Sequence, residues 1–275
     1  MTGKPFQTIR VERDGAAAVI TLDRPDKLNA INGAMMDELL TALDQAEADE
    51  RVRAIVVQGA GRAFSSGFEI GTLDRSSTAS VRAGLEADLA FILRFWDSPK
   101  PTLAAVHGYC LGGAFELAMA CDVTVAARDA LFGEPELKFG SGIVALLLPW
   151  LTGPKQAKQI LFAGLDRIPA ERAQAIGLVN EVVEPGRQLE AGLALARRMA
   201  TVDQSALRLT KQAVNRSYEI MGLRQALLQA LEVDVQIETT ETPESTEFRT
   251  ILRRDGLKAA LAWREARFGG PGERG

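Results

Sequence analysis

The 275-residue sequence is poor in the residues that mark metal sites, disulfide scaffolds and membrane spans. It has one histidine, His107, and two cysteines, Cys110 and Cys121, which lie in apolar sequence. This argues against a zinc site or a disulfide framework and favours a reducing compartment. Apolar runs such as residues 143–151 are far shorter than a membrane span. No apolar signal segment is found at the N-terminus. We therefore expect a soluble, cytoplasmic protein with no metal and no membrane contact.

The sequence also lacks a block of lysine and arginine. Its 32 basic and 36 acidic residues give a formal net charge of −4, and the basic residues are spread along the chain. Nucleic acid and anionic membranes are therefore not expected as partners, whereas a local basic patch for a phosphorylated ligand remains open. A hydrophobic content of 47% and a charged content of 25% are typical of a globular protein with a sizeable core.

The first two thirds of the chain alternate between two hydrophobic periods. Runs rich in β-branched residues predict strands, and runs with helical spacing predict helices between them. The predicted strands are 16–25, 53–61, 102–110 and 122–127, and the predicted helices are 33–49, 78–96 and 111–120. This alternation is typical of an α/β fold with parallel strands. Because the period is irregular, a spiral of β-β-α turns fits it.

From about residue 190 the strand patterns stop and only helical patterns follow. They cover residues 189–200, 204–219, 223–238 and 255–268. We therefore divide the chain into a core, 1–198, and a C-terminal helical region, 199–275. Four such helices only partly cover one another, so they are expected to pack on the core or on another subunit.

Two glycine-bearing turns, each with an acid beside it, are the candidate site. In "HGYCLGGAFELAMACD" (107–122) a strand gives way to a helix near Gly113, and Glu116 lies one turn further on the same face. A helix N-terminus presents free N–H groups and a positive dipole end, and glycine lets a ligand approach the backbone.

The first turn, "GRAFSSGFE" (61–69), offers a second backbone N–H at Ser66-Gly67-Phe68, followed by Glu69. Two convergent N–H groups make an oxyanion hole for a carbonyl or thioester oxygen. The residues alone also allow the plainer interpretation that the glycines merely permit tight strand-to-helix turns.

Longer motifs add a family resemblance. The stretches "ITLDRPDKLNAIN", "RAIVVQGAGRAFSSGFEI", "PTLAAVHGYCLGGAFELAMACDVTVAARDALFGEPELKFG" and "AERAQAIGLVNEVV" resemble the enoyl-CoA hydratase/isomerase (crotonase) superfamily, in its order, over residues 10–200. The resemblance implies a crotonase-like α/β spiral of β-β-α turns with a C-terminal helical oligomerisation region. It further implies an acyl-CoA substrate, no permanently bound cofactor beyond the substrate's coenzyme A, and a homotrimer or a hexamer built as a dimer of trimers. The oxyanion donors would be the N–H groups of Phe68 and Gly113.

By the same resemblance, Glu116 and Glu136 are the two catalytic glutamates. Members that hydrate a double bond carry both, whereas members that isomerise, dehalogenate, decarboxylate or hydrolyse often keep one. Hydration needs one carboxylate to orient and deprotonate water and a protonated partner to serve C2. We expect Glu116 in the first role and Glu136 in the second. The plainer alternative for Glu136 is a solvated loop acid.

These residues favour hydration of a 2-enoyl-CoA over three alternatives. An isomerase or a C–C hydrolase acting on a cyclic or branched acyl-CoA is the nearest rival. A non-catalytic CoA-binding scaffold is disfavoured because it has no need of both glutamates.

The coenzyme segment is assigned from the resemblance of "RPDKLNA" to the stretch that lies along the adenosine portion. Lys27 would meet a phosphate while Leu28 and Ala30 pack nearby, and the alternative is a solvated lysine. The first turn supplies further substrate-binding candidates, namely Ser66, Glu69, Ile70 and Gly71. Later cations are either solvated or reach a neighbouring subunit's coenzyme: Lys211, Arg253, Arg254, Lys258 and Arg264.

Three features depart from the family pattern. The usual glycine-rich segment is replaced by "GSGIVALLLPWLTG" (140–153), Phe68 stands where a small residue is common, and Glu69 replaces an aspartate. An apolar wall along 143–148 and the ring of Phe68 would favour a compact apolar acyl group. The alternative is that 143–148 is a core helix facing away from the site. His107 is expected to end a strand as a structural residue.

Overall fold

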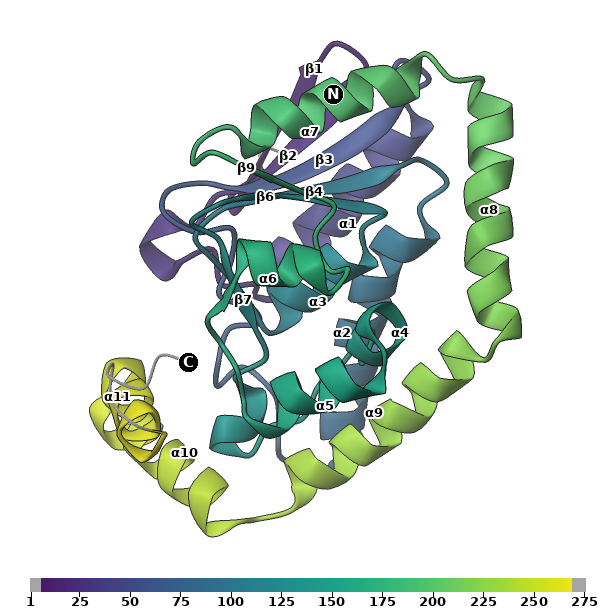
Figure 1. The fold of residues 1–275 in the computed structure, drawn as a ribbon. Coiled ribbons are helices and arrows are strands. Elements are labelled where there is room, and N and C mark those ends of the chain that lie inside the picture. The colour runs from purple at the N-terminus through teal and green to yellow at the C-terminus, as the bar shows by residue number, and fades with distance from the viewer. Residues whose placement is uncertain (1–5, 269–275) are drawn as a thin grey trace.

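The computed structural model describes residues 6–268, and a six-stranded sheet forms its centre (Figure 1). The strands are, in spatial order, β1 (Ile9–Asp14), β2 (Ala17–Leu22), β3 (Ala54–Gly59), β4 (Thr102–Val106), β6 (Val123–Ala127) and β9 (Glu181–Val183). Only the β1–β2 pair is antiparallel, and every later pair is parallel. Every residue of β2 and β4 is buried, as expected for strands covered on both faces.

A second, three-stranded sheet contains β5 (Tyr109–Leu111), β7 (Leu131–Gly133) and β8 (Ile168–Pro169). The chain passes from β4 to β5 and from β6 to β7, so each of these two turns adds one strand to each sheet. This is the β-β-α spiral predicted from the sequence. The single strand predicted over 102–110 is wrong, because the chain bends at Gly108, where φ is 55°, and leaves the first sheet.

Helices cover both faces of the large sheet. On one face lie α1 (Gly33–Ala48), α2 (Thr78–Asp97) and α3 (Gly113–Ala120), whose apolar residues form the main core with the sheet. On the other face α7 (Gln188–Ala200) packs Leu193 and Ala196 against Val19, Val56 and Ala105. Figure 1 shows α7 above the sheet and α3 below it.

Short elements fill the connections between the two sheets and the helices. They are the 3₁₀ turns η1 (Pro25–Lys27) and η2 (Glu136–Phe139) and the helices α4 (Leu148–Thr152), α5 (Pro154–Phe162) and α6 (Ala170–Ala175). The last two of these helices lead from the site region back to β9. In the part of the chain that the structure describes, no helix is long and apolar enough to cross a membrane.

The C-terminal region wraps around one side of this core (Figure 1). It consists of α8 (Gln204–Ile220), α9 (Leu223–Thr239), α10 (Pro243–Asp255) and α11 (Leu257–Arg267). α10 was missed by the sequence patterns, although it begins at a capping box formed by Thr242 and Ser245. α9 packs along α2 and places Leu227 and Leu231 in the main core. The expected packing of these helices on the core is therefore confirmed for α9.

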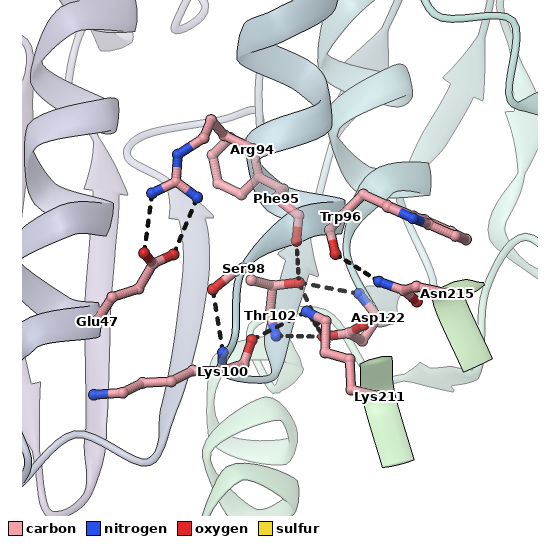
Figure 2. A network of polar contacts seen from close by, with 10 residues as sticks. All are labelled: Glu47, Arg94, Phe95, Trp96, Ser98, Lys100, Thr102, Asp122, Lys211 and Asn215. Atoms are coloured by element: carbon pink, nitrogen blue, oxygen red, sulfur yellow. Dashed lines mark hydrogen bonds and ion pairs between the residues drawn. The ribbon is translucent and has the colours of Figure 1, made fainter. Parts of the chain in front are cut away.

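A polar network anchors α8, which otherwise buries none of its residues (Figure 2). Lys211 Nζ donates to Asp122 at 2.7 Å and to the carbonyl of Lys100 at 3.1 Å. Asn215 Nδ2 donates to the carbonyl of Trp96 at 2.9 Å. The side chain of Lys211 is only 9% exposed, so its placement on a solvated helix face is wrong.

Candidate active site

The first glycine turn is held between two other segments by backbone hydrogen bonds. Phe64 N–H donates to the carbonyl of His107 at 2.8 Å, and Leu111 N–H donates to Ser65 at 3.2 Å. On its other side, Ile31 N–H donates to Gly67 at 2.8 Å. The turn at 64–69 therefore lies between residues 28–31 and the second turn, and the predicted approach of the two turns is seen in the structure.

A buried asparagine braces this arrangement from within. The Nδ2 group of Asn29 lies 2.8, 2.9 and 3.1 Å from the carbonyl oxygens of Ala60, Ala63 and Phe64. Its Oδ1 accepts the N–H of Arg24 at 2.9 Å. Asn29 adopts a left-handed conformation with φ of 53°, which asparagine tolerates better than most residues. It ties the coenzyme segment to the first turn.

The N–H groups of Phe68 and Gly113 are available at the point where the turns meet. Within residues 6–268 neither N–H donates a hydrogen bond. Gly113 is the first residue of α3, so its N–H also lies at the positive end of that short helix. A Cβ at Gly67, where φ is 91°, would lie 3.2 Å from Gly113 N and 2.6 Å from the carbonyl oxygen of Leu111. The two turns thus approach closely only because residue 67 is glycine.

Glu116 lies one turn into α3 and is buried, with 1% exposed. Its Oε2 accepts the N–H of Ala145 at 3.0 Å, which leaves Oε1 toward the site. Burial raises the pKa of Glu116 well above its ordinary value, and the nearby carboxyl of Glu136 raises it further.

Glu136 begins η2 and reaches the same helix start from the opposite side. A Cβ at Gly112 would collide with its Oε1, so glycine is required there. Its Oε2 is buried and has no hydrogen-bond partner within residues 6–268. Burial raises the pKa of Glu136 to about 7. The alternative of a solvated loop acid is therefore wrong.

The two glutamates share one proton near neutral pH, because two neighbouring buried carboxyls resist joint ionisation. The pKa of Glu116 lies well above its usual range, whereas that of Glu136 is about 7.

Three further acids around this pair were missed from the sequence. Glu134 is fully buried beside Glu136, and burial and then the charge of Glu136 raise its pKa. Asp88 on α2 and Asp234 on α9 each have a pKa raised to about 7, mainly by burial. A signal existed for Asp88, because it interrupts the apolar helical stripe of α2.

The segment that replaces the family's glycine-rich loop reaches Glu116. Residues 140–147 form a loop, and α4 begins only at Leu148. Ala145 in this loop donates its N–H to Glu116. The alternative of a core helix facing away from the site is therefore wrong. The ring of Phe68 lies directly against Gly113, where a Cβ would collide with it.

The candidate coenzyme residues surround the same turns. Lys27 is exposed at the end of η1, and Leu28 and Ala30 are half-buried beside it. The half-buried Ser66 donates its N–H to the carbonyl of Leu28 at 3.0 Å. The exposed Lys27 side chain is therefore free to meet a phosphate.

The remaining first-turn candidates contact protein. Glu69 pairs with Arg24 at 2.9 Å. Ile70 packs on the cluster formed by Phe248 and Ile251 of α10, and Gly71 approaches Leu252 of the same helix. The first turn is thereby linked to the C-terminal helices.

His107 has the structural role expected of it. Its Nε2 lies 2.9 Å from the carbonyl oxygen of Gly61, at the start of the first turn. Arg264 is one of the cations expected either to be solvated or to reach a neighbouring subunit's coenzyme. Its side chain is instead only 11% exposed and lies beside Asp166 and Glu265. Among residues 6–268 no group of three histidine, cysteine or acidic side chains is placed to hold a metal ion.

Comparisons with known proteins define the class to which this fold and site belong. The family model for enoyl-CoA hydratase/isomerase matches residues 12–267. The crystal structure of an enoyl-CoA hydratase/isomerase from Xanthobacter autotrophicus Py2 is 48% identical, with a TM-score of 0.93, and the match covers 97% of this chain and 100% of that chain.

Two curated relatives extend the comparison. A short-chain-enoyl-CoA hydratase from Clostridium acetobutylicum is 36% identical over 221 residues, covering 78% of this chain and 83% of the relative. A crotonyl-CoA hydratase from Syntrophomonas wolfei is 33% identical over 270 residues, covering 96% and 98%. The chain belongs to the enoyl-CoA hydratase/isomerase family and is an enzyme of the crotonase superfamily.

Proposed function

We propose that the protein adds water to the double bond of a 2-enoyl-CoA. The observation that carries the proposal is the placement of two carboxyls at one helix start. Glu116 lies on α3, Glu136 reaches Gly112 from η2, and the N–H of Gly113 is free between them. The names of the relatives, a short-chain-enoyl-CoA hydratase and a crotonyl-CoA hydratase, support the same substrate class.

The thioester oxygen would accept hydrogen bonds from the N–H groups of Phe68 and Gly113. As water attacks C3, negative charge develops on this oxygen, and two preorganised donors stabilise it most in the transition state. The OH group bonds to C3, one carboxylate takes the proton that water loses, and the other carboxyl delivers a proton to C2. The pair ends with one proton, as it began.

Within this pair, Glu116 orients the water and Glu136 donates the proton. The hydrogen bond from Ala145 holds one oxygen of Glu116 and leaves the other for water. Oε2 of Glu136 has no protein partner among residues 6–268 and is free to carry a proton toward C2.

The coenzyme and the assembly complete the proposal. Coenzyme A enters as part of the substrate, with Lys27 at a phosphate and Leu28 and Ala30 beside the adenosine portion. We infer a homotrimer or a dimer of trimers that acts in the cytoplasm, built through residues 199–275. The exposed apolar side chains of α8 support this role for the region.

The rival activities in this fold use fewer of the observed groups. An isomerase moves a proton between two carbons and needs no carboxylate to activate water, so a single acid suffices. A scaffold needs neither carboxyl, yet two buried acids are maintained here at the cost of desolvation.

The test is glutamine substitution of each acid. Glu116→Gln and Glu136→Gln are each expected to lower the kcat for crotonyl-CoA hydration by at least about 100-fold, as is typical for loss of a general acid or base. Affinity for free coenzyme A should change little, because neither acid is proposed to touch the nucleotide. Loss of the enoyl thioester absorbance follows the reaction.

Glu12→Gln, an exposed change on β1, is the matched control and should retain wild-type turnover. Near-wild-type turnover of either site variant would refute the two-glutamate mechanism. Conversion of a 3-enoyl-CoA without hydration of any 2-enoyl-CoA would favour the isomerase.

A further inference from the structure

Two helices carry acids in line with apolar buried residues. On α2 the half-buried Asp88 lies in line with the buried Val81, Leu85, Ile92 and Phe95. On α9 the buried stripe consists of Leu223, Leu227, Leu231, Asp234 and Glu238. The two helices pack against each other. Buried acids are rare unless they are paired, because burial strips the carboxylate of its water. The buried Asp234 and Glu238 therefore each require a partner.

Glu238 has its partners within the chain. It forms an ion pair with Arg75 and accepts hydrogen bonds from Ser141 Oγ and from the N–H of Gly142, the latter at 3.3 Å. These contacts fix the start of the loop at 140–147 against α9. Glu238 is thus accounted for by structure alone.

Asp234, one turn before Glu238, has no such partner. It is only 2% exposed, and neither carboxyl oxygen has a hydrogen-bond partner within residues 6–268. Its Oδ1 points at the backbone of Gly142, where any Cβ would collide with it. The carboxyl therefore faces the loop that leads to Ala145 and the catalytic Glu116.

Asp234 and Asp88 lie within electrostatic range of the reacting centre. The charges of Asp234 and Asp88 both contribute to the raised pKa of Glu116, and the charge of Asp88 also contributes to the raised pKa of Asp234. Arg75 is the cation that opposes them, and it is already paired with Glu238. Two further carboxyls thus act on Glu116, and the one cation among the groups acting on Asp234 is already paired.

We propose that the acyl group of the substrate carries a hydrogen-bond donor remote from its double bond, a hydroxyl or an ammonium group, which Asp234 and Asp88 bind. The proposal rests on the function proposed above and names the substrate class for that site. A donor satisfies the unpartnered oxygens of Asp234, and a cation would also relieve the repulsion among the acids. Ile143 and Leu146 on the loop at 140–147 are half-buried. Their side chains favour a compact acyl chain between the thioester and the remote donor.

The first experiment measures binding without turnover. Pentanoyl-CoA, 5-hydroxypentanoyl-CoA and 5-aminopentanoyl-CoA are saturated, so they bind whether or not the protein hydrates enoyl thioesters. Calorimetry on the full-length protein should give at least about 10-fold tighter binding for the hydroxyl or the amino compound than for pentanoyl-CoA, as expected of a hydrogen bond to a charged group. The compound with the larger gain identifies the donor.

The second experiment removes the acceptors. Asp234→Leu replaces the acid by an apolar side chain. It should reduce the ratio of the affinity for the hydroxyl or amino compound to the affinity for pentanoyl-CoA by at least about 10-fold. Asp234→Asn separates the donors, because a neutral amide oxygen still accepts from a hydroxyl but no longer attracts an ammonium group. Asp234→Asn also allows the proposal to be tested if the Asp234→Leu variant does not fold. Asp88→Asn should lower the ratio in the same direction.

Glu86→Gln, an exposed change on α2, is the control and should leave the ratio unchanged. Equal or tighter binding of pentanoyl-CoA, or an unchanged ratio in both Asp234 variants, would overturn the proposal. Failure of hydration with every enoyl-CoA, alongside selective binding of the polar compounds, would instead refute the proposed function and leave this inference standing.

Discussion

At the scale of single residues, the chemistry depends on how burial alters a few carboxyls. Glu116, Glu134 and Glu136 are ordinary glutamates in the sequence, and desolvation is the largest cause of the raised pKa in each. A carboxyl that keeps its proton near neutral pH can serve as an acid, while its ionised neighbour serves as a base. Glu116 and Glu136 were predictable from the sequence as candidates, whereas Glu134 and the effect of burial on all three carboxyls were not.

The raised pKa of Glu136 predicts a pH dependence. Below a pH of about 7 both glutamates are protonated and no base is available, and above it one proton leaves the pair. The value of kcat/KM for a 2-enoyl-CoA should therefore rise as the pH increases through about 7, since this parameter reports ionisations of the free enzyme.

Initial rates at low substrate concentration, measured from about pH 5.5 to about pH 8.5, check this prediction. Glu12→Gln should keep the inflection of the wild-type protein. A flat profile over this range would show that the pair is already singly ionised at the acidic end.

At the scale of elements, a loop and a helix start hold the two proposed oxyanion donors, Phe68 and Gly113. The turn at 64–69 is bonded to residues 28–31 on one side and to β5 on the other. The glycines in the two turns predict this close backbone contact from the sequence, because glycine has no Cβ to prevent it. The asparagine that closes the arrangement from inside was not recognised, since a single Asn in a Pro-containing segment is common in loops.

Asn29→Ala is expected to destabilise both the protein and the site. Three buried carbonyl oxygens would lose their shared donor, and alanine would be strained at a φ of 53°. The expected loss is about 3 kcal/mol of unfolding free energy, with the unsatisfied carbonyls as the main cause. Denaturant unfolding measures it, and kcat/KM should fall because the Phe68 N–H is no longer held in place.

The exposed substitution Thr41→Ala on α1 is the control, with an expected change of about 0.5 kcal/mol or less. An Asn29→Ala protein as stable as this control would show that water replaces the asparagine. That result would remove it from the support of the first turn.

At the scale of the whole molecule, the C-terminal region has two distinct surfaces. α9 buries an apolar stripe in the core, whereas α8 buries no residue and is held to the core by Lys211 and Asn215. Leu209 and Val214 on α8 are each 52% exposed. Apolar side chains gathered on one helix are typical of an interface.

Introducing charge on α8 should therefore separate the subunits. The double variant Leu209→Glu/Val214→Glu is expected to sediment as a monomer, while the wild-type protein sediments as a trimer or hexamer, because carboxylates cannot be buried unpaired in a contact. Circular dichroism should remain unchanged, since neither side chain is part of the core. A wild-type protein that sediments as a stable monomer would contradict the proposed assembly.

The sequence by itself determined the α/β class, most helices, the two glycine turns and the identity of Glu116, Glu136, Phe68 and Gly113 as candidates. These features depend on local periodicity and on motifs, which the order of residues carries directly. The tertiary structure alone decided that strand 102–110 divides at Gly108, that the loop at 140–147 reaches Glu116, and that α2 and α9 pack together so that Asp88 and Asp234 both act on Glu116. The last two result from contacts between segments up to about 146 residues apart in the chain, and burial acts on a carboxyl only through such neighbours.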